Sequence, residues 1–110
     1  VKGIGSKLIQ AYKLRSLEVD LIAPHIKSSP YKTIVCGDFN DTPVSYSYRR
    51  IRGELNDAFT DAGFGIGNTY AKGIPLFRID YILHNLKTVS YKRIEKAWSD
   101  HYAVTALLEY

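Results

Sequence analysis

Apolar residues in the first part of the chain recur with the period of an α-helix. Intervals of three and four residues place apolar side chains on one face of a helix, and the residues predicted on this face are Ile4, Leu8, Ala11, Val19, Ile22 and Ile26. Pro24 lacks an amide proton and crowds the carbonyl four residues before it, so we expect a kink or a restart near residues 20–23. The pattern therefore predicts a long amphipathic helix that ends by Pro30.

Later segments have the pattern of β-strands. Short apolar or alternating runs that are bounded by glycine, proline or polar residues are typical of strands. The last and longest of these runs is apolar enough for the middle of a sheet. The predicted strands are Thr33–Cys36, Asn68–Tyr70, Phe77–Leu83, Leu86–Arg93 and Tyr102–Tyr110.

A short helix is predicted after the first strand. Thr42 is suited to cap it, and Pro43 fits the first helical position, where a missing amide proton costs nothing. Gly53 is a typical helix stop, so we expect the helix to end near Arg52. Gly63–Gly67 is expected to be a loop rather than a phosphate-binding cradle, because the pattern indicates neither a strand before it nor a helix after it.

Composition and charge limit the class of protein. The chain has 110 residues, of which 45% are hydrophobic and 24% charged, and these values are typical of one folded domain. The net charge of +4 would suit an anionic substrate, although a solvated basic face explains it as well. Cys36 has no partner for a disulfide, and its apolar neighbours predict a buried, unreactive thiol.

Two absences bear on location and length. No run approaches the roughly 18 apolar residues that a membrane-spanning helix needs, so we expect no membrane contact from this segment. The sequence also contains no methionine. We therefore expect the chain to be a piece of a longer protein, and its localisation stays unknown.

The clearest chemistry begins where the first predicted strand ends. Asp38 and Asn40 stand two residues apart, so on an extended chain they project the same way. The carboxylate can handle a proton or a metal-bound water, while the amide can donate to an anionic oxygen. The same Asp-x-Asn spacing is also typical of a turn or a helix cap. From these two residues alone, both interpretations stay open.

A second acid, Asp80, lies inside the hydrophobic Phe77–Leu83 strand. A carboxylate there needs a partner to offset its desolvation, and Arg78 and His101 are the candidates. If Asp80 accepts from one ring nitrogen of His101, the other nitrogen is fixed as a base or a donor. Asp100 projects to the opposite face of the chain and is then left to bind a hard cation. The alternative is that His101 is an ordinary surface histidine.

Three segments, in this order, resemble the carboxy-terminal signature of the endonuclease/exonuclease/phosphatase superfamily of metal-dependent phosphoesterases. They are Cys36–Asp41, Arg78–Ile82 and Ser99–His101. The resemblance implies an α+β fold with helices packed on one face of a mixed β-sheet, which is one half of a four-layer α/β/β/α sandwich. It also implies that residues 1–110 are the carboxy-terminal half of such a domain, because no segment precedes the first helix to supply the amino-terminal metal-binding glutamate.

The same resemblance implies roles for the polar residues. Asp38 would handle the proton of the attacking water or of the leaving group, and Asn40 would contact the scissile phosphate. Asp80 would orient His101, which would act on the phosphate or on its attacking water. Asp100, together with Asp38, would help to hold Mg²⁺ or Mn²⁺.

The substrate class implied by the resemblance is a phosphate ester, either nucleic acid or a phosphorylated lipid or inositol. Arg49, Arg50 and Arg52 on the short helix could follow a phosphate backbone, but a solvated helix face explains them as well. The alternative function, from a different class, is a non-catalytic domain that recognises a phosphorylated ligand or a partner protein.

The half-domain interpretation has two expected consequences. Without the glutamate the metal site should be weak and this chain should be inactive by itself, while the intact protein would be a Mg²⁺-dependent phosphoesterase. One face of the strands would also lack its covering sheet. We therefore expect a homodimer in which a second copy covers that face.

Overall fold

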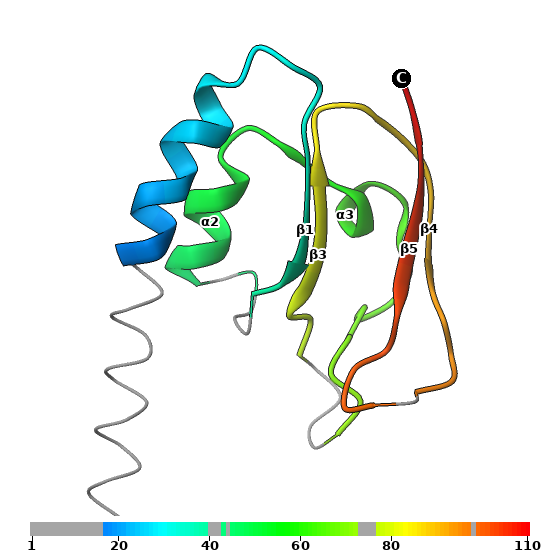
Figure 1. Cartoon of the computed structure of the whole chain (residues 1–110). Coiled ribbons are helices and arrows are strands. Elements are labelled where there is room, and N and C mark those ends of the chain that lie inside the picture. The colour runs from blue at the N-terminus through cyan, green and yellow to red at the C-terminus, as the bar shows by residue number, and fades with distance from the viewer. Residues whose placement is uncertain (1–16, 40–42, 44, 73–76, 98) are drawn as a thin grey trace, which may run out of the picture.

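The computed structural model describes residues 17–39, 43, 45–72, 77–97 and 99–110. An amino-terminal helix occupies residues 17–28, and the later elements follow it as two short helices and five strands (Figure 1). Within these described ranges, no helix has the length and apolar character needed to cross a membrane. In chain order the later elements are β1 (Ile34–Asp38), α2 (Tyr46–Arg52), β2 (Asn56–Asp57), α3 (Ala58–Ala62), β3 (Asp80–His84), β4 (Lys87–Arg93) and β5 (Val104–Glu109).

The strands form two small antiparallel sheets. β3 lies between β1 and β2 in one sheet, and β4 pairs with β5 in the other. Helices and sheets together confirm the α+β class. The described strands divide into two antiparallel sheets where a single mixed sheet is expected from the resemblance. Alternation within a strand predicts which residues share a face, but it carries no information about which strand becomes the neighbour.

The prediction that Tyr102–Tyr110 forms a central strand is wrong for the described part of the chain. There β5 pairs with β4 on one side only. Its side chains alternate between half-buried and exposed positions, with Leu107 59% exposed. A strand that is covered on one face alternates in this way, whereas a central strand buried on both faces does not.

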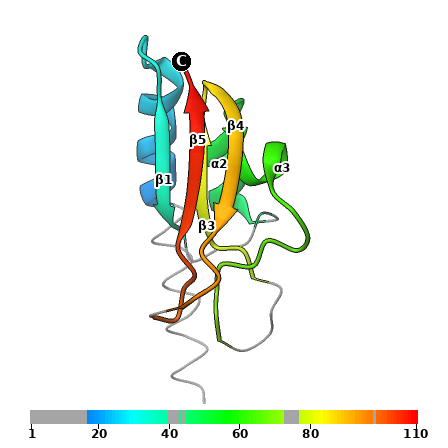
Figure 2. The same ribbon diagram turned by 90° about the vertical axis from the view of Figure 1, so that its right-hand side faces the viewer.

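The core lies between the helices and one face of the β1–β3 pair. Ala23 of the amino-terminal helix and Tyr48 and Ile51 of α2 pack with Tyr81 and Leu83 of β3. Figure 1 shows the two helices side by side next to β1 and β3, while Figure 2 shows α3 beside β4 and away from β1. Val19 and Ile26 of the predicted apolar face pack against this core, but Ile22 is 50% exposed and Ala23 is buried instead, so the predicted face is confirmed only in part.

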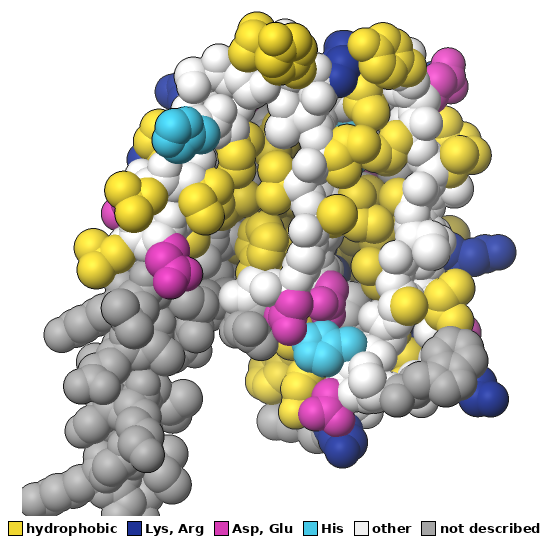
Figure 3. All heavy atoms as spheres, in the orientation of Figure 1, with side chains coloured by type: hydrophobic (Ala, Val, Ile, Leu, Met, Phe, Trp, Pro, Cys, Tyr) yellow, Lys and Arg dark blue, Asp and Glu magenta, His cyan; other side chains and the backbone are white. Residues whose placement is uncertain are grey.

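Within the part of the chain that the structure describes, the opposite face of these strands is open. The residues of this open apolar face line a groove of about 630 Å³ between the β1–β3 pair and β5. Figure 3 shows hydrophobic side chains gathered on this side of the molecule. The open apolar face consists of Ile34, Cys36, Ile82, Val104, Ala106 and Leu108.

Cys36 belongs to this face, so the prediction of a buried thiol is wrong. The residue is exposed. Its neighbour Val35 points the other way and packs against the helices. Because successive residues of a strand alternate between faces, burial of Val35 places Cys36 on the uncovered side.

Serine caps the short helix α2 in place of the predicted threonine. The Ser45 hydroxyl accepts from the amide of Tyr48 at 3.1 Å, and Thr42 lies outside the described residues. Gly53 stops the helix as predicted, with a φ of 49° that favours glycine and an amide that donates to the Arg49 carbonyl at 3.1 Å. The helix therefore begins at Tyr46, later than the predicted Pro43 start.

A buried ion pair links α3 to the start of the β3 segment. Asp57 is fully buried, and its carboxylate accepts from Arg78 Nη1 at 2.9 and 3.1 Å and from the Tyr48 hydroxyl at 2.5 Å. It also caps α3 by accepting from the amide of Phe59 at 3.0 Å. Arg78 is thus committed to Asp57 and cannot serve as the partner of Asp80.

Candidate functional site

Two carboxylates meet at one end of the β1–β3 pair. Because the strands are antiparallel, the carboxyl end of β1 lies beside the amino end of β3, and Asp38 is directly opposite Asp80 in the register. Residues opposite each other in a sheet project to the same face. The resulting pair lies at the end of the groove below the open apolar face, where Figure 3 shows acidic and histidine side chains together.

His101 lies between these carboxylates. Its Nδ1 is 2.7 Å from Asp80 Oδ2, and its Nε2 is 3.5 Å from Asp38 Oδ2. A carboxylate can only accept, so Nδ1–H donates to Asp80. The ring is therefore held with Nε2 facing Asp38. Of the two candidate partners for Asp80, the structure selects His101.

The pKa of His101 is raised above its ordinary value. The main cause is the hydrogen bond to Asp80, which favours the charged ring; partial desolvation opposes the shift, and the charges of the nearby carboxylates add to it. The side chain is 29% exposed, so solvent and small ligands can still reach it. This combination suits a group that exchanges protons with a bound molecule.

Backbone contacts fix the segment that carries His101. The Ser99 hydroxyl accepts from the amide of His101 at 3.1 Å. Tyr70 forms a β-bridge with His101 and presents its ring to the imidazole in an edge arrangement at 5.8 Å between centroids. Asn68–Tyr70, predicted as a short strand, therefore contributes an isolated bridge in place of a longer ladder.

Asp100 directly precedes His101 in the sequence but pairs with a lysine, Lys72. Its carboxylate is 3.0 Å from Lys72 Nζ, and both side chains are more than half exposed. The hydrogen bond that Lys72 donates to Asp100 raises the pKa of Lys72. The opposite directions predicted for Asp100 and His101 explain why only His101 reaches the carboxylate pair.

The donor set fits a divalent cation in part. Asp38, Asp80 and His101 each offer a ligand atom within 4.8 Å of the others. Carboxylate oxygens are the ligands that Mg²⁺ and Mn²⁺ take, but the imidazole already shares its Nδ1 with Asp80. Asp100 would add a further carboxylate if it exchanged Lys72 for the ion. Asn40, the remaining predicted site residue, lies outside the described residues.

Lys72 and Asp57 are polar residues that the sequence analysis did not single out. For Asp57 a signal exists, because an acid directly before Ala58 and Phe59 is typical of a helix cap. For Lys72 no local pattern distinguishes a lysine that pairs with Asp100 from any other lysine in a polar loop.

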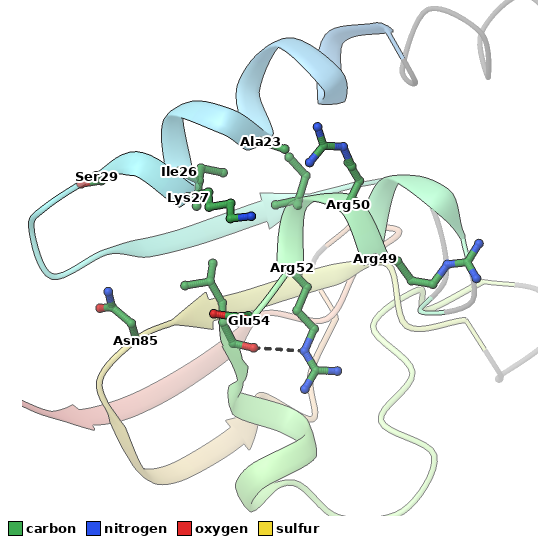
Figure 4. Close-up of a pocket in the computed structure, with 12 residues that line it drawn as sticks. Ala23, Ile26, Lys27, Ser29, Arg49, Arg50, Arg52, Glu54 and Asn85 are labelled. Atoms are coloured by element: carbon green, nitrogen blue, oxygen red, sulfur yellow. Dashed lines mark hydrogen bonds between the residues drawn. The ribbon is translucent and has the colours of Figure 1, made fainter.

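The three arginines of α2 line a separate cavity of about 430 Å³ between the helices and Asn85. Figure 4 shows Arg49 and Arg50 extending in different directions. Arg50 Nε donates to Asp20 at 3.2 Å, and Arg52 Nε donates to the Leu55 carbonyl at 3.1 Å. These contacts favour the solvated-face interpretation over a track for a phosphate backbone.

Comparison with known proteins gives one match. The model of a family described as the Endonuclease/Exonuclease/phosphatase family matches residues 11–101, a range that contains both carboxylates and His101 at its end. No curated protein and no solved structure matches the chain.

Proposed function

Because the chain belongs to the endonuclease/exonuclease/phosphatase family, we propose that it is the carboxy-terminal half of a Mg²⁺- or Mn²⁺-dependent phosphoesterase. The reaction is hydrolysis of a phosphodiester or phosphomonoester by water. The observation that carries the proposal is the position of His101, bonded to Asp80 at 2.7 Å and facing Asp38 at 3.5 Å.

In this proposal the three side chains divide the proton chemistry. Asp80 holds the ring of His101 by its Nδ1–H, which leaves Nε2 for the phosphate or its attacking water. A protonated ring can donate to an anionic phosphate oxygen, and its raised pKa favours that state. Asp38 takes the proton of the water or supplies the proton of the leaving group. Asn40 donates its amide to the scissile phosphate.

The metal would be held by Asp38 together with Asp100, once the Asp100 carboxylate exchanges Lys72 for the ion. A bound Mg²⁺ or Mn²⁺ polarises the phosphoryl oxygens and lowers the pKa of a coordinated water. The described residues supply few ligands, and Asp100 is bonded to Lys72 at 3.0 Å. We therefore propose weak metal binding and no turnover for the 110-residue chain alone, with activity in the intact protein.

The substrate is a phosphate ester, and the choice between nucleic acid and a phosphorylated lipid or inositol stays open. The contacts of the α2 arginines give no preference, because Arg50 donates to Asp20 and Arg52 donates to the Leu55 carbonyl. Among the described residues, Lys72 is a basic residue beside the site, where it pairs with Asp100.

We also propose that the isolated chain forms a two-fold homodimer through the open apolar face. Ile34 in this face is 53% exposed. Covering about 400 Å² of apolar surface at about 25 cal/mol per Å² stabilises a complex by on the order of 10 kcal/mol before the cost of association. That figure is large beside the marginal stability of a small domain.

The test is an assay of the intact protein with Mg²⁺ against a panel of nucleic-acid and small phosphoester substrates. We expect turnover of at least one substrate, and a loss of roughly 10² or more for Asp38→Asn and for His101→Ala. Binding of a phosphorylated ligand without turnover would support the alternative, a non-catalytic recognition domain. The 110-residue chain, assayed in parallel, should be inactive.

A further inference from the structure

Thr69 is a fully buried polar residue that lies beside the site without belonging to it. Its hydroxyl oxygen accepts two backbone hydrogen bonds, from the amide of Ile79 at 2.9 Å and from the amide of Asp80 at 3.1 Å. One hydroxyl can accept two such bonds, whereas an alkyl group of the same shape accepts none. The side chain of Thr69 therefore fixes the backbone from which the Asp80 carboxylate extends.

The backbone of Thr69 reaches the segment of His101. The Thr69 carbonyl accepts from the amide of Tyr102 at 2.7 Å, and the amide of Ala71 donates to the Asp100 carbonyl at 2.6 Å. These two bonds lie on either side of His101 in the sequence. They align the histidine segment with residues 69–71 and set its distance from Asp80.

The third segment of the site is connected through Ile79. The Ile79 amide is bound by the Thr69 hydroxyl, and the Ile79 carbonyl accepts from the amide of Phe39 at 2.9 Å. Phe39 directly follows Asp38. Thr69 thus lies within two hydrogen bonds of all three segments that carry the side chains of the cluster.

We propose that Thr69 is a positioning residue, which holds Asp80 and His101 at the separation that lets their side chains form the 2.7 Å hydrogen bond. It touches neither substrate nor metal, and it acts through the backbone of its partners. Its importance for turnover rests on the proposed phosphoesterase function. The geometric claim does not, because it concerns a hydrogen bond that exists without substrate.

The alternative is that Thr69 contributes only to stability. A buried threonine whose bonds are removed destabilises any fold, so a loss of stability or of activity cannot separate the two roles. The two roles are separated by observing the hydrogen bond between His101 Nδ1–H and Asp80. This bond should give a downfield proton resonance in NMR spectra of the ¹⁵N-labelled chain.

The matched variants are Thr69→Val and Thr69→Ser. Valine keeps the shape and removes the acceptor, and serine keeps the acceptor. Thr88→Val is the control, because the Thr88 hydroxyl contacts His84 Nε2 at 2.7 Å and Asp61 at 2.8 Å, at the other end of β3. It removes a half-buried hydroxyl with two hydrogen-bond contacts away from the site.

We expect the downfield resonance of His101 in the wild type, in Thr69→Ser and in Thr88→Val, and its loss in Thr69→Val. The amide of Asp80 should also exchange with solvent at least about tenfold faster in Thr69→Val, as expected when an acceptor is removed from a buried amide. An unchanged resonance in folded Thr69→Val, with reduced stability only, would overturn the proposal.

A second measurement needs no variant and covers the case in which Thr69→Val does not fold. In the wild-type chain the amides of Ile79, Asp80 and Tyr102 should be protected from hydrogen exchange to the same degree as the amide of Leu83 in the core of β3. Exchange of the three amides at the rate of exposed loops, while Leu83 stays protected, would show that Thr69 does not hold them.

Discussion

Replacing Asp80 with asparagine removes the charge that holds His101 and keeps the shape of the side chain. The affected hydrogen bond is 2.7 Å long, and the side chains of His101 and Asp80 are 29% and 18% exposed. The asparagine oxygen can still accept from Nδ1–H, so the variant replaces a bond to a charged group, about 1.5–3 kcal/mol, with a neutral one, about 0.5–1.5 kcal/mol, and should cost about 1–2 kcal/mol. For a domain of this size the corresponding fall in Tm is about 4–10 °C.

This loss of stability should depend on pH in a definite direction. The hydrogen bond to Asp80 raises the pKa of His101 in the folded protein. A group with a raised folded pKa stabilises the fold fully below its unfolded pKa, about 6.5 for histidine, and this stabilisation is lost as pH rises through the folded pKa. The free energy of unfolding should therefore differ most between wild type and Asp80→Asn below about pH 6.5, while carboxylates are still ionised.

The assay is urea unfolding at a series of pH values, together with an NMR titration of the His101 ring. Asp100→Asn is the control, because it removes the same charge beside His101 from a carboxylate that is bonded to Lys72 instead. Its effect should be smaller and nearly independent of pH. An equal pKa of His101 in wild type and Asp80→Asn, or a difference in stability that does not vary with pH, would refute the reasoning.

Three further predictions concern metal, assembly and the buried ion pair. The 110-residue chain should show no calorimetric heat at micromolar Mg²⁺. Lys72→Gln should tighten Mn²⁺ binding a few-fold, because the ammonium no longer competes for Asp100, and an unchanged affinity would exclude that competition. Sedimentation at micromolar concentration should show a dimer that Ile34→Glu converts to monomer, and a well-folded wild-type monomer would contradict the half-domain interpretation. Arg78→Met should cost about 3–5 kcal/mol in urea unfolding by leaving the Asp57 charge buried without its main partner, and a cost below about 1 kcal/mol would contradict this.

The local elements could be predicted from sequence because their causes are local. The spacing of Val19 and Ile26 predicts two residues of the helix face that packs on the strands, whereas Ile22, predicted on the same face, is exposed. The carboxylate of Asp80 inside an apolar strand requires a nearby partner, which limits the candidates to Arg78 and His101, and the structure selects His101.

Neighbours between strands could not be predicted from the same patterns. Alternation places Cys36 on one face of β1, but only the fold determines that the described residues leave this face uncovered. Arg78 pairs with Asp57, a residue 21 positions earlier, so the sequence around β3 alone does not reveal this ion pair. The pairing of β5 with β4 is likewise set by the path of the chain after β3.

The pairing of Asp80 and His101 as one catalytic unit is tested most directly by a double-mutant cycle in the intact protein. Turnover with Mg²⁺ is measured for wild type, Asp80→Asn, His101→Ala and the double mutant, with unfolding curves to confirm that each is folded. Each single mutant should lose roughly 10² or more in turnover, and the double mutant should be about as slow as the worse single mutant. Losses that multiply in the double mutant, or full turnover in His101→Ala, would contradict the proposed site.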